Sequence, residues 1–326
     1  MAPTPTRRPL SGPGRTTAAV AALAACALTL TACGSSDAKS GAGKGRSVEV
    51  TDATGTAVSV PAAPKRVVAL SEMDLDAALT LGARPVGLTA GRGQQGAPAY
   101  LAAKAKGIPV VGAVTGPDIE KVVQAKPDVI LAGQLADKQV LGQLRTIAPT
   151  VVTIGADKNW RKALELTGKT LGRTNQAEKF LDDYDGKAAA LKKDLGDRAG
   201  ASVSVARYSA KGTAVMQQGV FIGDVLNDLG FKRPGIQAQP GKGHSTPLSE
   251  ENLKEIDADW LFIGTLDPGS SQASLLTKLT GKPAYRQLNA VRDHHATVID
   301  GSKWTSLGGP QAAVSVLDDI RKAMVK

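Results

Sequence analysis

The segment 174–196 is the feature that most constrains the fold of this chain. Its apolar residues recur at steps of three and four, which places them on one face of a helix rather than on a strand. Asn175 and Glu178 form a predicted capping pair at its start. At about 1.5 Å per residue the helix is roughly 33 Å long, close to the diameter of a small domain. A helix of this length can join two separate lobes.

The sequences on the two sides of this helix resemble each other. DIEKVVQAKPDVILAG (118–133) and SEENLKEIDADWLFIG (249–264) align without a gap, which pairs Glu120 with Glu251 and Asp128 with Asp259. Each segment is predicted to form a helix, a turn and a buried strand. Such a likeness can also arise between any two βα units. Two similar lobes leave a cleft between them, and clefts of this kind bind ligands.

Short buried strands alternate with helices on both sides, which indicates largely parallel sheets. A hairpin is predicted over 47–60, and the further strands at 67–70, 85–88, 108–111, 128–131, 151–154, 203–207, 260–263 and 296–300. The fold class is therefore α/β, with two Rossmann-like lobes joined by a single long helix and a ligand cleft between the lobes. We expect the N-terminal lobe at 47–172, the interlobe helix at 173–197 and the C-terminal lobe at 198–326.

The N-terminus is typical of an exported protein. An apolar run over 16–33 follows Arg7, Arg8 and Arg15, and it is too short and too rich in alanine for a membrane span. Leu30-Thr31-Ala32-Cys33 resembles the lipobox of bacterial lipoproteins, which implies a signal peptide at 1–32 and a lipid on Cys33. Residues 33–46 are then a flexible tether, and the protein is anchored at the extracytoplasmic face of the cell membrane. Both the Sec and the Tat export routes remain open.

Composition excludes several classes of function. The formal charge is +10, and three of the cations lie before Cys33, where there is no acid, so +7 remains on the rest of the chain. These cations are scattered and not interleaved with aromatic residues, so we expect no nucleic-acid partner, whereas a mildly cationic cleft for an anion fits the charge. Of the two cysteines, Cys26 lies in the signal peptide, which is removed on cleavage, and Cys33 carries the lipid. Free-thiol chemistry and cysteine metal sites are therefore excluded from the mature fold.

The catalytic motifs that the chain contains fail on inspection. Segment 91–96 matches the dinucleotide fingerprint GxGxxG, but Pro98 delays the helix that should begin inside it. An exported protein also meets little NAD. The only histidines are His244, His294 and His295, too few for a metal site without converging carboxylates. We therefore expect neither an enzyme nor a bound cofactor or resident metal.

Five residues on predicted strand-end loops are candidates for ligand binding, because such loops line ligand sites in α/β sheets. They are Arg92, Trp160, Arg207, Tyr208 and Trp304. Arginine pairs with carboxylate or hydroxamate oxygens, and aromatic rings offer flat apolar faces to a bulky ligand. Each residue alone can equally be structural. Trp260 differs because it lies inside a strand, and we expect it in the core.

Four segments carry a resemblance to a known family. PKRVVALSEMDLDAALTLGARPVGLT, EKVVQAKPDVILAG, IAPTVV and WTSLGGPQAAVSVLDDI resemble the periplasmic binding proteins that deliver iron-siderophore, heme or vitamin B12 to ABC importers. The resemblance covers about 47–324. It implies two α/β lobes bridged by one long helix, and VARYSAKGTAVMQQGVFIGDVLNDLGFKRP is most similar to ferric-siderophore binders. Arg207 matches a position that commonly faces the ligand in them.

The resemblance also implies a function and partners. We expect a monomeric lipoprotein that captures an Fe(III)-siderophore and presents it to a permease dimer with its ATPase. One acidic residue on each lobe is implied to dock onto the permease, at Glu251 and at Asp76, with Glu72 or Asp74 as alternatives to Asp76. A heme or cobalamin-type ligand is the alternative within the family, and an exported nucleotide-dependent oxidoreductase is the alternative outside it. The siderophore class and the permease remain open.

Overall fold

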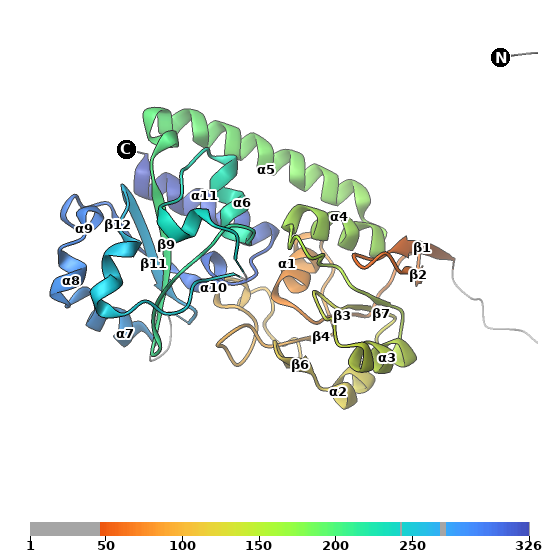
Figure 1. Cartoon of the computed structure of the whole chain (residues 1–326). Helices are drawn as coiled ribbons and strands as arrows, with labels where there is room; N and C mark the ends of the chain where they lie inside the picture. The colour runs from red at the N-terminus through yellow and green to blue at the C-terminus, as the bar shows by residue number, and fades with distance from the viewer. Residues whose placement is uncertain (1–45, 242, 268–271, 326) are drawn as a thin grey trace, which may run out of the picture. The chain divides into compact units, whose positions relative to one another are not determined.

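The chain forms two four-stranded sheets, one on each side of the long helix α5 (Thr174–Leu195) in the sequence. The computed structural model, drawn in Figure 1, describes residues 46–241, 243–267 and 272–325. The predicted signal peptide, Cys33 and all of the tether except Arg46 lie outside these residues. Within the described ranges, no helix combines the length and the apolar character needed to cross a bilayer.

An antiparallel hairpin opens the described chain, as predicted. It consists of β1 (Ser47–Thr51) and β2 (Ala57–Pro61). The turn is held by Asp52, whose carboxylate accepts the backbone N–H groups of Thr54 and Thr56 at 2.8 and 3.0 Å. Gly55 takes a φ of 84°, which is why a glycine stands there.

The first sheet is parallel and has the strand order β4-β3-β7-β8. Its strands are β3 (Val67–Ala69), β4 (Gly87–Leu88), β7 (Val129–Leu131) and β8 (Thr150–Val151). Its helices are α1 (Glu72–Thr80), η1 (Ala99–Leu101), α2 (Ile119–Gln124), α3 (Lys138–Ile147) and α4 (Trp160–Thr170), and β5 (Gly112–Ala113) pairs with β6 (Gly116–Pro117). The predicted strand at 108–111 is wrong, since only a single bridge joins Val110 to Leu88. Pro109 has no N–H to give a ladder.

The second sheet has the order β10-β9-β11-β12, and β10 alone runs antiparallel to its neighbour. Its strands are β9 (Val203–Ser209), β10 (Gly212–Val215), β11 (Trp260–Thr265) and β12 (Ala296–Asp300). The helical segments are η2 (Gly196–Gly200), α6 (Phe221–Asp228), η3 (Gly235–Ala238), η4 (Glu250–Ile256), α7 (Gln272–Thr280), α8 (Pro283–Arg286), α9 (Asn289–Arg292), α10 (Gly301–Trp304) and α11 (Pro310–Met324). The predicted helix at 249–256 is wound as a 3₁₀ helix, for which the sequence offers no reason.

The long helix α5 occupies the predicted position and spans 22 residues. It packs against α4 from before it in the sequence and against α11 from the end of the chain (Figure 1). The predicted capping pair of Asn175 and Glu178 is wrong, because the helix begins at Thr174 and Arg173 caps it without a side-chain hydrogen bond. Lys192 and Lys193 lie in its last turn, where the helix dipole favours cations.

The internal repeat has a structural counterpart in each half. Asp128 accepts the backbone N–H groups of Lys65 and Arg66 just before β3, at 2.7 and 2.9 Å. Its sequence partner Asp259 accepts the N–H of Ser202 just before β9, at 2.7 Å. In both halves an aspartate before a buried strand therefore fixes the entry of the neighbouring strand.

A single hydrophobic core joins the two sheets and the helix between them. It contains buried side chains of α1, α4, α5, α6, α11 and β11, among them Met73, Leu164, Leu191, Val225, Phe262 and Ile320. Helix α1, which follows the first strand of the first sheet, packs directly against α11, which follows the last strand of the second. Residues 45–326 accordingly form one compact unit. The position of one sheet relative to the other is fixed by apolar packing.

Candidate functional site

A cavity of about 140 Å³ lies where loops of the two sheets meet. The described residues that line it are Met73, Arg92, Gln134, Lys158, Arg207, Met216, Val220, Phe221, Gly243, His244, Thr305, Ser306 and Leu307. These residues follow or end strands of both sheets, as expected for a ligand site in α/β folds. Two of them, Arg92 and Arg207, are predicted ligand residues. Among the described lining residues there is no carboxylate.

Arg92 reaches the cavity from the loop after β4. Its backbone N–H donates to the Oε1 atom of Glu72, which fixes the loop. The Nε atom of its guanidinium is buried and has no hydrogen-bond partner among the described residues. A buried donor without a partner is costly, so this side chain is poised to donate to an incoming acceptor.

Arg207 reaches the cavity from β9 in the other half of the chain. Its Nη1 atom donates to the carbonyl of Thr305 at 3.1 Å. Burial lowers the pKa of Arg207, and the positive charge of Arg92 lowers it further, while the negative charge of Glu72 opposes both. Two cations are therefore held near each other at the cavity wall, an arrangement that favours an anion between them.

Glu72, at the start of α1, holds the base of the cavity together. Its Oε2 atom accepts the backbone N–H of Leu307 at 3.2 Å and the hydroxyl of Ser306. Only 3% of the residue is exposed. Because its oxygens are already engaged by Arg92, Ser306 and Leu307, Glu72 joins the two halves of the site and leaves the cavity wall cationic.

The polar lining residues Gln134, Lys158, His244, Thr305 and Ser306 were not individual candidates. Gln134 follows β7 and Lys158 follows β8, so both lie on loops that the sequence marks as strand ends. A lone lysine or glutamine on a loop is normally solvated, so the sequence alone gives no signal that Gln134 or Lys158 lines a ligand site. His244, named above only in rejecting a metal site, lines the cavity, and its Nδ1 atom lies 2.8 Å from the carbonyl oxygen of Ser245.

Two of the predicted ligand residues are core residues instead. Trp160 and Trp304 are each 0% exposed, so neither ring can contact a ligand. Trp160 packs edge-on against Tyr184 of α5, with 4.9 Å between ring centroids. Trp304 stacks on Phe262 and donates its Nε1–H to Asp319 at 2.8 Å. Trp160 begins α4 and Trp304 ends α10. Both rings pack into the core beneath the loops, because removing their large apolar surface from water stabilises the fold.

Tyr208 does not line the cavity either. It is the neighbour of Arg207 on β9, and successive side chains of a strand point to opposite faces of the sheet. Arg207 therefore faces the cavity, while Tyr208 packs with the apolar cluster of Ala206, Leu253 and Leu261 on the other face. The strand was predicted to end at Arg207, but β9 continues to Ser209, so its alternation turns the two side chains to opposite faces. Trp260 is buried as expected and stacks on His295.

The structure buries all three acids expected to dock in the first lobe, Asp76, Glu72 and Asp74. Asp76 is 0% exposed, and its oxygens accept the backbone N–H groups of Gln311 and Ala312 at the start of α11, at 3.0 and 3.1 Å. Burial raises the pKa of Asp74 to about 6, against the opposing hydrogen bonds of Thr153, Ser71 and Gly133. Glu72 is engaged in the cavity base. Glu251, by contrast, is exposed in the first turn of η4.

The glycine-rich segment 91–96 is a turn and not the start of a helix. The N–H of Gly91 donates to the carbonyl of Gly96 at 2.7 Å, and the next helical piece is the three-residue η1. Such a short turn provides no helix N-terminus for a pyrophosphate. Among the described residues, no group of three or more His, Cys, Asp and Glu side chains could hold a metal.

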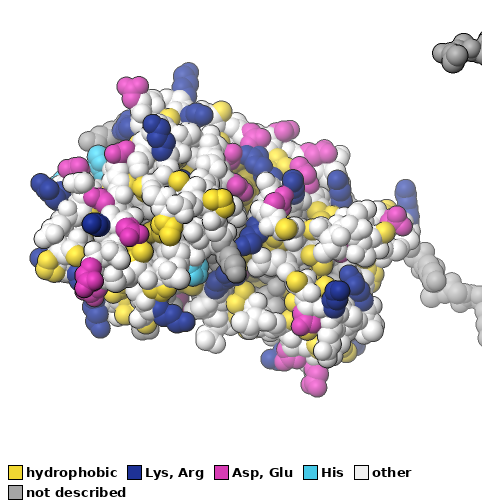
Figure 2. Space-filling view, viewed as in Figure 1, with side chains coloured by type: hydrophobic (Ala, Val, Ile, Leu, Met, Phe, Trp, Pro, Cys, Tyr) yellow, Lys and Arg dark blue, Asp and Glu magenta, His cyan; other side chains and the backbone are white. Residues whose placement is uncertain are grey.

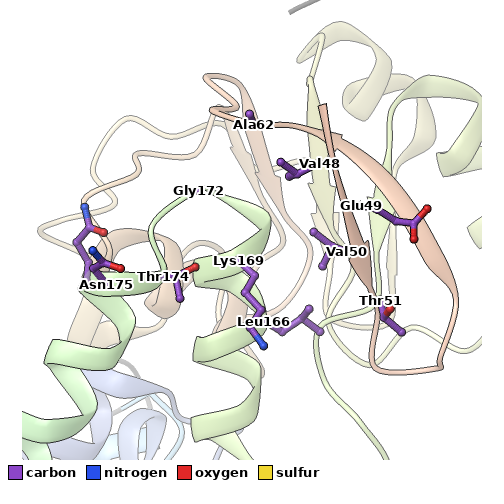
Figure 3. Close-up of a pocket in the computed structure, with 11 residues that line it drawn as sticks. Val48, Glu49, Val50, Thr51, Ala62, Leu166, Lys169, Gly172, Thr174 and Asn175 are labelled. Atoms are coloured by element: carbon purple, nitrogen blue, oxygen red, sulfur yellow. The ribbon is translucent and has the colours of Figure 1, made fainter. Parts of the chain in front are cut away.

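Several hollows larger than this cavity are lined mainly by the half of the chain that contains the first sheet. One, of about 800 Å³, lies between β1 and the α4–α5 junction. Figure 3 shows Val48 and Val50 facing the helices there, Glu49 pointing away, and Lys169 on α4. It is open, and no predicted ligand residue lines it. We place the site at the smaller cavity because the guanidinium groups of Arg92 and Arg207, one from each half of the chain, converge there.

Charge elsewhere on the surface is mixed. Figure 2 shows Lys and Arg side chains interspersed with Asp and Glu over the face in view. Several exposed or half-exposed cations are paired with acids, as in Lys179 with Asp183 and Arg321 with Asp194. The cavity differs from this surface in that the charged residues among its described lining are all cations.

Known proteins resemble the chain over most of its length. Residues 67–302 match the family described as periplasmic binding protein. The chain is similar to the probable siderophore-binding lipoprotein YfiY of Bacillus subtilis (strain 168), with 32% identity over 310 residues that cover 92% of this chain and 95% of that protein. It is 29% identical to the achromobactin-binding periplasmic protein of Dickeya dadantii (strain 3937) over 264 residues, which cover 79% and 86% of the two chains.

A solved structure gives the same result for the fold. Staphylococcus aureus SirA, crystallised in complex with staphyloferrin B, superposes with a TM-score of 0.73 at 30% identity. The superposition covers 85% of this chain and 98% of that one. Together with the match over 67–302, this similarity places both halves of the fold and the helix between them within one known architecture. The chain belongs to the periplasmic binding protein family.

Proposed function

We propose that this chain is the solute-binding lipoprotein of an ABC importer, which captures an Fe(III)-siderophore outside the membrane and delivers it to a permease with its ATPase. The observation that carries the proposal is the cationic cavity, to which each half of the chain contributes one arginine. The names of its relatives support it, since YfiY is described as siderophore-binding and SirA was crystallised with staphyloferrin B. The lipid on Cys33 and the monomeric state belong to the same proposal.

The cavity favours an anionic chelate. Ferric complexes of carboxylate or catecholate siderophores carry net negative charge, whereas those of simple trihydroxamates are neutral. Carboxylate and catecholate oxygens accept paired N–H bonds from guanidinium groups. An anion between Arg92 and Arg207 relieves their mutual repulsion and satisfies the buried Nε atom of Arg92. The protein itself does no chemistry on the iron in this scheme; it binds, orients and releases a finished complex.

A titration tests the proposal directly. We expect ferric staphyloferrin B or a ferric catecholate to quench the tryptophan fluorescence of the detergent-solubilised full chain saturably, and the iron-free siderophore to bind much more weakly. Arg92→Gln and Arg207→Gln are each expected to weaken binding about 10- to 100-fold, the range for a charge-assisted hydrogen bond. Arg292→Gln, at an exposed position on α9, is the matched control and should bind like the wild type.

The same titration includes the competing ligands. Heme, cobalamin and NADH are titrated alongside the ferric chelates, and heme binding is followed by its Soret band. Binding of heme or cobalamin with no response to any ferric siderophore would assign the cavity to those ligands. Saturable NADH binding that is lost on Gly93→Asp would assign an enzyme function and contradict the proposal.

For docking onto the permease we propose Glu120 together with Glu251. The internal repeat pairs these two residues, and each lies exposed in the first turn of a helix, α2 for Glu120 and η4 for Glu251. Glu120 thereby takes the place of the buried Asp76. Two acids at equivalent positions in two similar halves suit a partner that is itself a dimer with two-fold symmetry.

Charge reversal separates docking from binding. We expect Glu120→Arg and Glu251→Arg each to abolish uptake of radiolabelled ferric siderophore by cells, and to leave the dissociation constant of the purified protein unchanged. Glu178→Arg, at an exposed position on α5, is the control and should support normal uptake. Normal uptake by the Glu120 and Glu251 variants, or a changed affinity, would show that the docking surface lies elsewhere.

A further inference from the structure

A second hollow, here called the side groove, adjoins the cavity on the half of the chain that contains the first sheet. It has a volume of about 750 Å³ and lies between the β1–β2 turn, α3 and the loop after β8. Its apolar residues are Leu135, Leu141, Val152 and Ile154, together with Ala53, Ala136 and Ala156. Leu135, Leu141 and Val152 belong to one small apolar cluster with Ala132. The groove therefore has a preformed apolar floor.

The side groove has a cationic rim and no acid. Lys138, Arg145 and Lys158 are the charged residues among its described lining, which contains no Asp or Glu. Lys138 and Arg145 are exposed, and within the described ranges neither forms an ion pair. Elsewhere on the same half of the chain, Lys121 and Lys162 are paired with neighbouring aspartates. An apolar floor below cations without acids fits an aliphatic chain that ends in an anionic group.

The side groove and the cavity share part of their walls. Gln134 and Lys158 line both. The cavity alone, at about 140 Å³, is smaller than the roughly 300–1,000 Å³ that ligand pockets usually provide. A chelate whose core lies between Arg92 and Arg207 can therefore extend past Lys158 along the groove.

We propose that the side groove is a second subsite, which holds a pendant arm of the ferric chelate: an aliphatic spacer that ends in a carboxylate. The spacer lies on Leu135, Leu141 and Ile154, and the carboxylate pairs with Lys138 and Arg145. This inference rests on the proposed function and narrows it to chelates with an extended acidic arm. The iron-binding core itself stays in the cavity.

The test uses two probes with one iron-binding core. They are the ferric complexes of two citrate monoamides, in which one terminal carboxylate is amidated either by methylamine, as the armless probe, or by 6-aminohexanoic acid. On the full chain we expect the arm to tighten binding at least 10-fold. Lys138→Ala/Arg145→Ala should lose this gain and bind the armless methylamide complex as the wild type does. The double variant Lys106→Ala/Arg292→Ala removes the same charge from exposed positions outside the groove and should keep the gain.

A charge-conserving exchange and an iron-free probe complete the design. Lys138→Arg/Arg145→Lys is expected to retain most of the gain, since both cations remain. Equal binding of the two probes by the wild type, or equal weakening of both by Lys138→Ala/Arg145→Ala, would overturn the subsite and leave the proposed function standing. Decanoate that binds without competing with the chelate that carries the 6-aminohexanoic acid arm would also overturn the subsite, because the groove would then be a separate site. Loss of all ferric-chelate binding on Arg92→Gln/Arg207→Gln is the separate check of the proposed function.

Discussion

Asp76 shows how a buried carboxylate serves structure at a position where the sequence predicted docking. Its two oxygens receive the first free N–H groups of α11, at Gln311 and Ala312, and the hydroxyl of Tyr100 at 3.0 Å. A helix N-terminus carries partial positive charge, which favours an anion there. Gly309 makes this approach possible, because a Cβ atom at that position would lie 2.6 Å from an oxygen of Asp76. One aspartate thereby joins α1 to α11, the first and the last helix of the described residues.

Substitutions of Asp76 measure how much these hydrogen bonds contribute to the free energy of unfolding. Asp76→Ala leaves the N–H groups of Gln311 and Ala312 without an acceptor, so we expect the free energy of unfolding to fall by about 2–4 kcal/mol. Asp76→Asn keeps one acceptor oxygen and should cost less. Urea denaturation gives both values, and Asp182→Ala, at an exposed position on α5, is the control. An Asp76→Ala protein as stable as the wild type would show that water replaces the carboxylate.

At this scale the sequence could identify Arg92 and Arg207 as cavity residues but not the aromatic candidates. A predicted strand followed by a loop locates a residue at the ligand-binding edge, which is enough for a long, charged side chain that avoids burial. The direction of a tryptophan depends on which helices pack below the loop, and this is settled only by tertiary contacts. Trp160, for example, packs against Tyr184, which lies 24 positions later in the sequence.

Helices α4, α5 and α6 meet at a cluster of charges centred on Arg161. Its Nη2 atom lies 2.7 Å from Asp185 of α5 and 3.1 Å from Asp228 of α6, and Tyr184 donates to Asp228 at 2.9 Å. Asp224, one turn before Asp228 on α6, lies beside this cluster. Burial raises the pKa of Asp224 to about 6, the negative charge of Asp228 adds to the rise, Arg161 opposes it, and Asp157 adds a smaller increase.

The raised pKa of Asp224 predicts a pH dependence of stability. Its folded pKa of about 6 lies above the ordinary 3.8, so the folded state binds more protons between these values, and stability falls as pH rises through this window. Asp224→Asn removes this loss. We expect a higher Tm than the wild type at pH 8, and a smaller difference near pH 4.5, in calorimetric scans. A Tm difference that is equal at both pH values would contradict the assignment.

Whole elements were the best predicted part of the molecule. The period of α5, the buried runs of β3, β7 and β11 and the paired aspartates Asp128 and Asp259 all follow from local patterns that survive folding. Pro109 prevented a predicted strand. The strand predicted at 203–207 was too short, because β9 continues to Ser209, and this extension turns Tyr208 away from Arg207. The side groove could not be predicted, since only the folded sheet brings the β1–β2 turn, α3 and the loop after β8 together.

The molecule as a whole is expected to move little on binding. The core is continuous through α1, α4, α5 and α11, and Glu72 and Asp76 bond the first half of the chain to the second. Wide opening would break this packing. We therefore expect the radius of gyration, measured by small-angle scattering, to change by less than about 1 Å when a ferric siderophore saturates the protein. Compaction by several ångströms would show that the lobes separate in the free state.

The packing of α1 against α11 also bears on how such proteins can diversify. Each half carries a face that is completed only by the other, so a half transplanted alone into a relative would meet a foreign surface and expose apolar side chains. Recombination between family members is then expected to give a folded protein only when α1, α5 and α11 all come from the same parent. New specificities are accordingly expected to arise through changes in the loops, with the scaffold inherited as a single block.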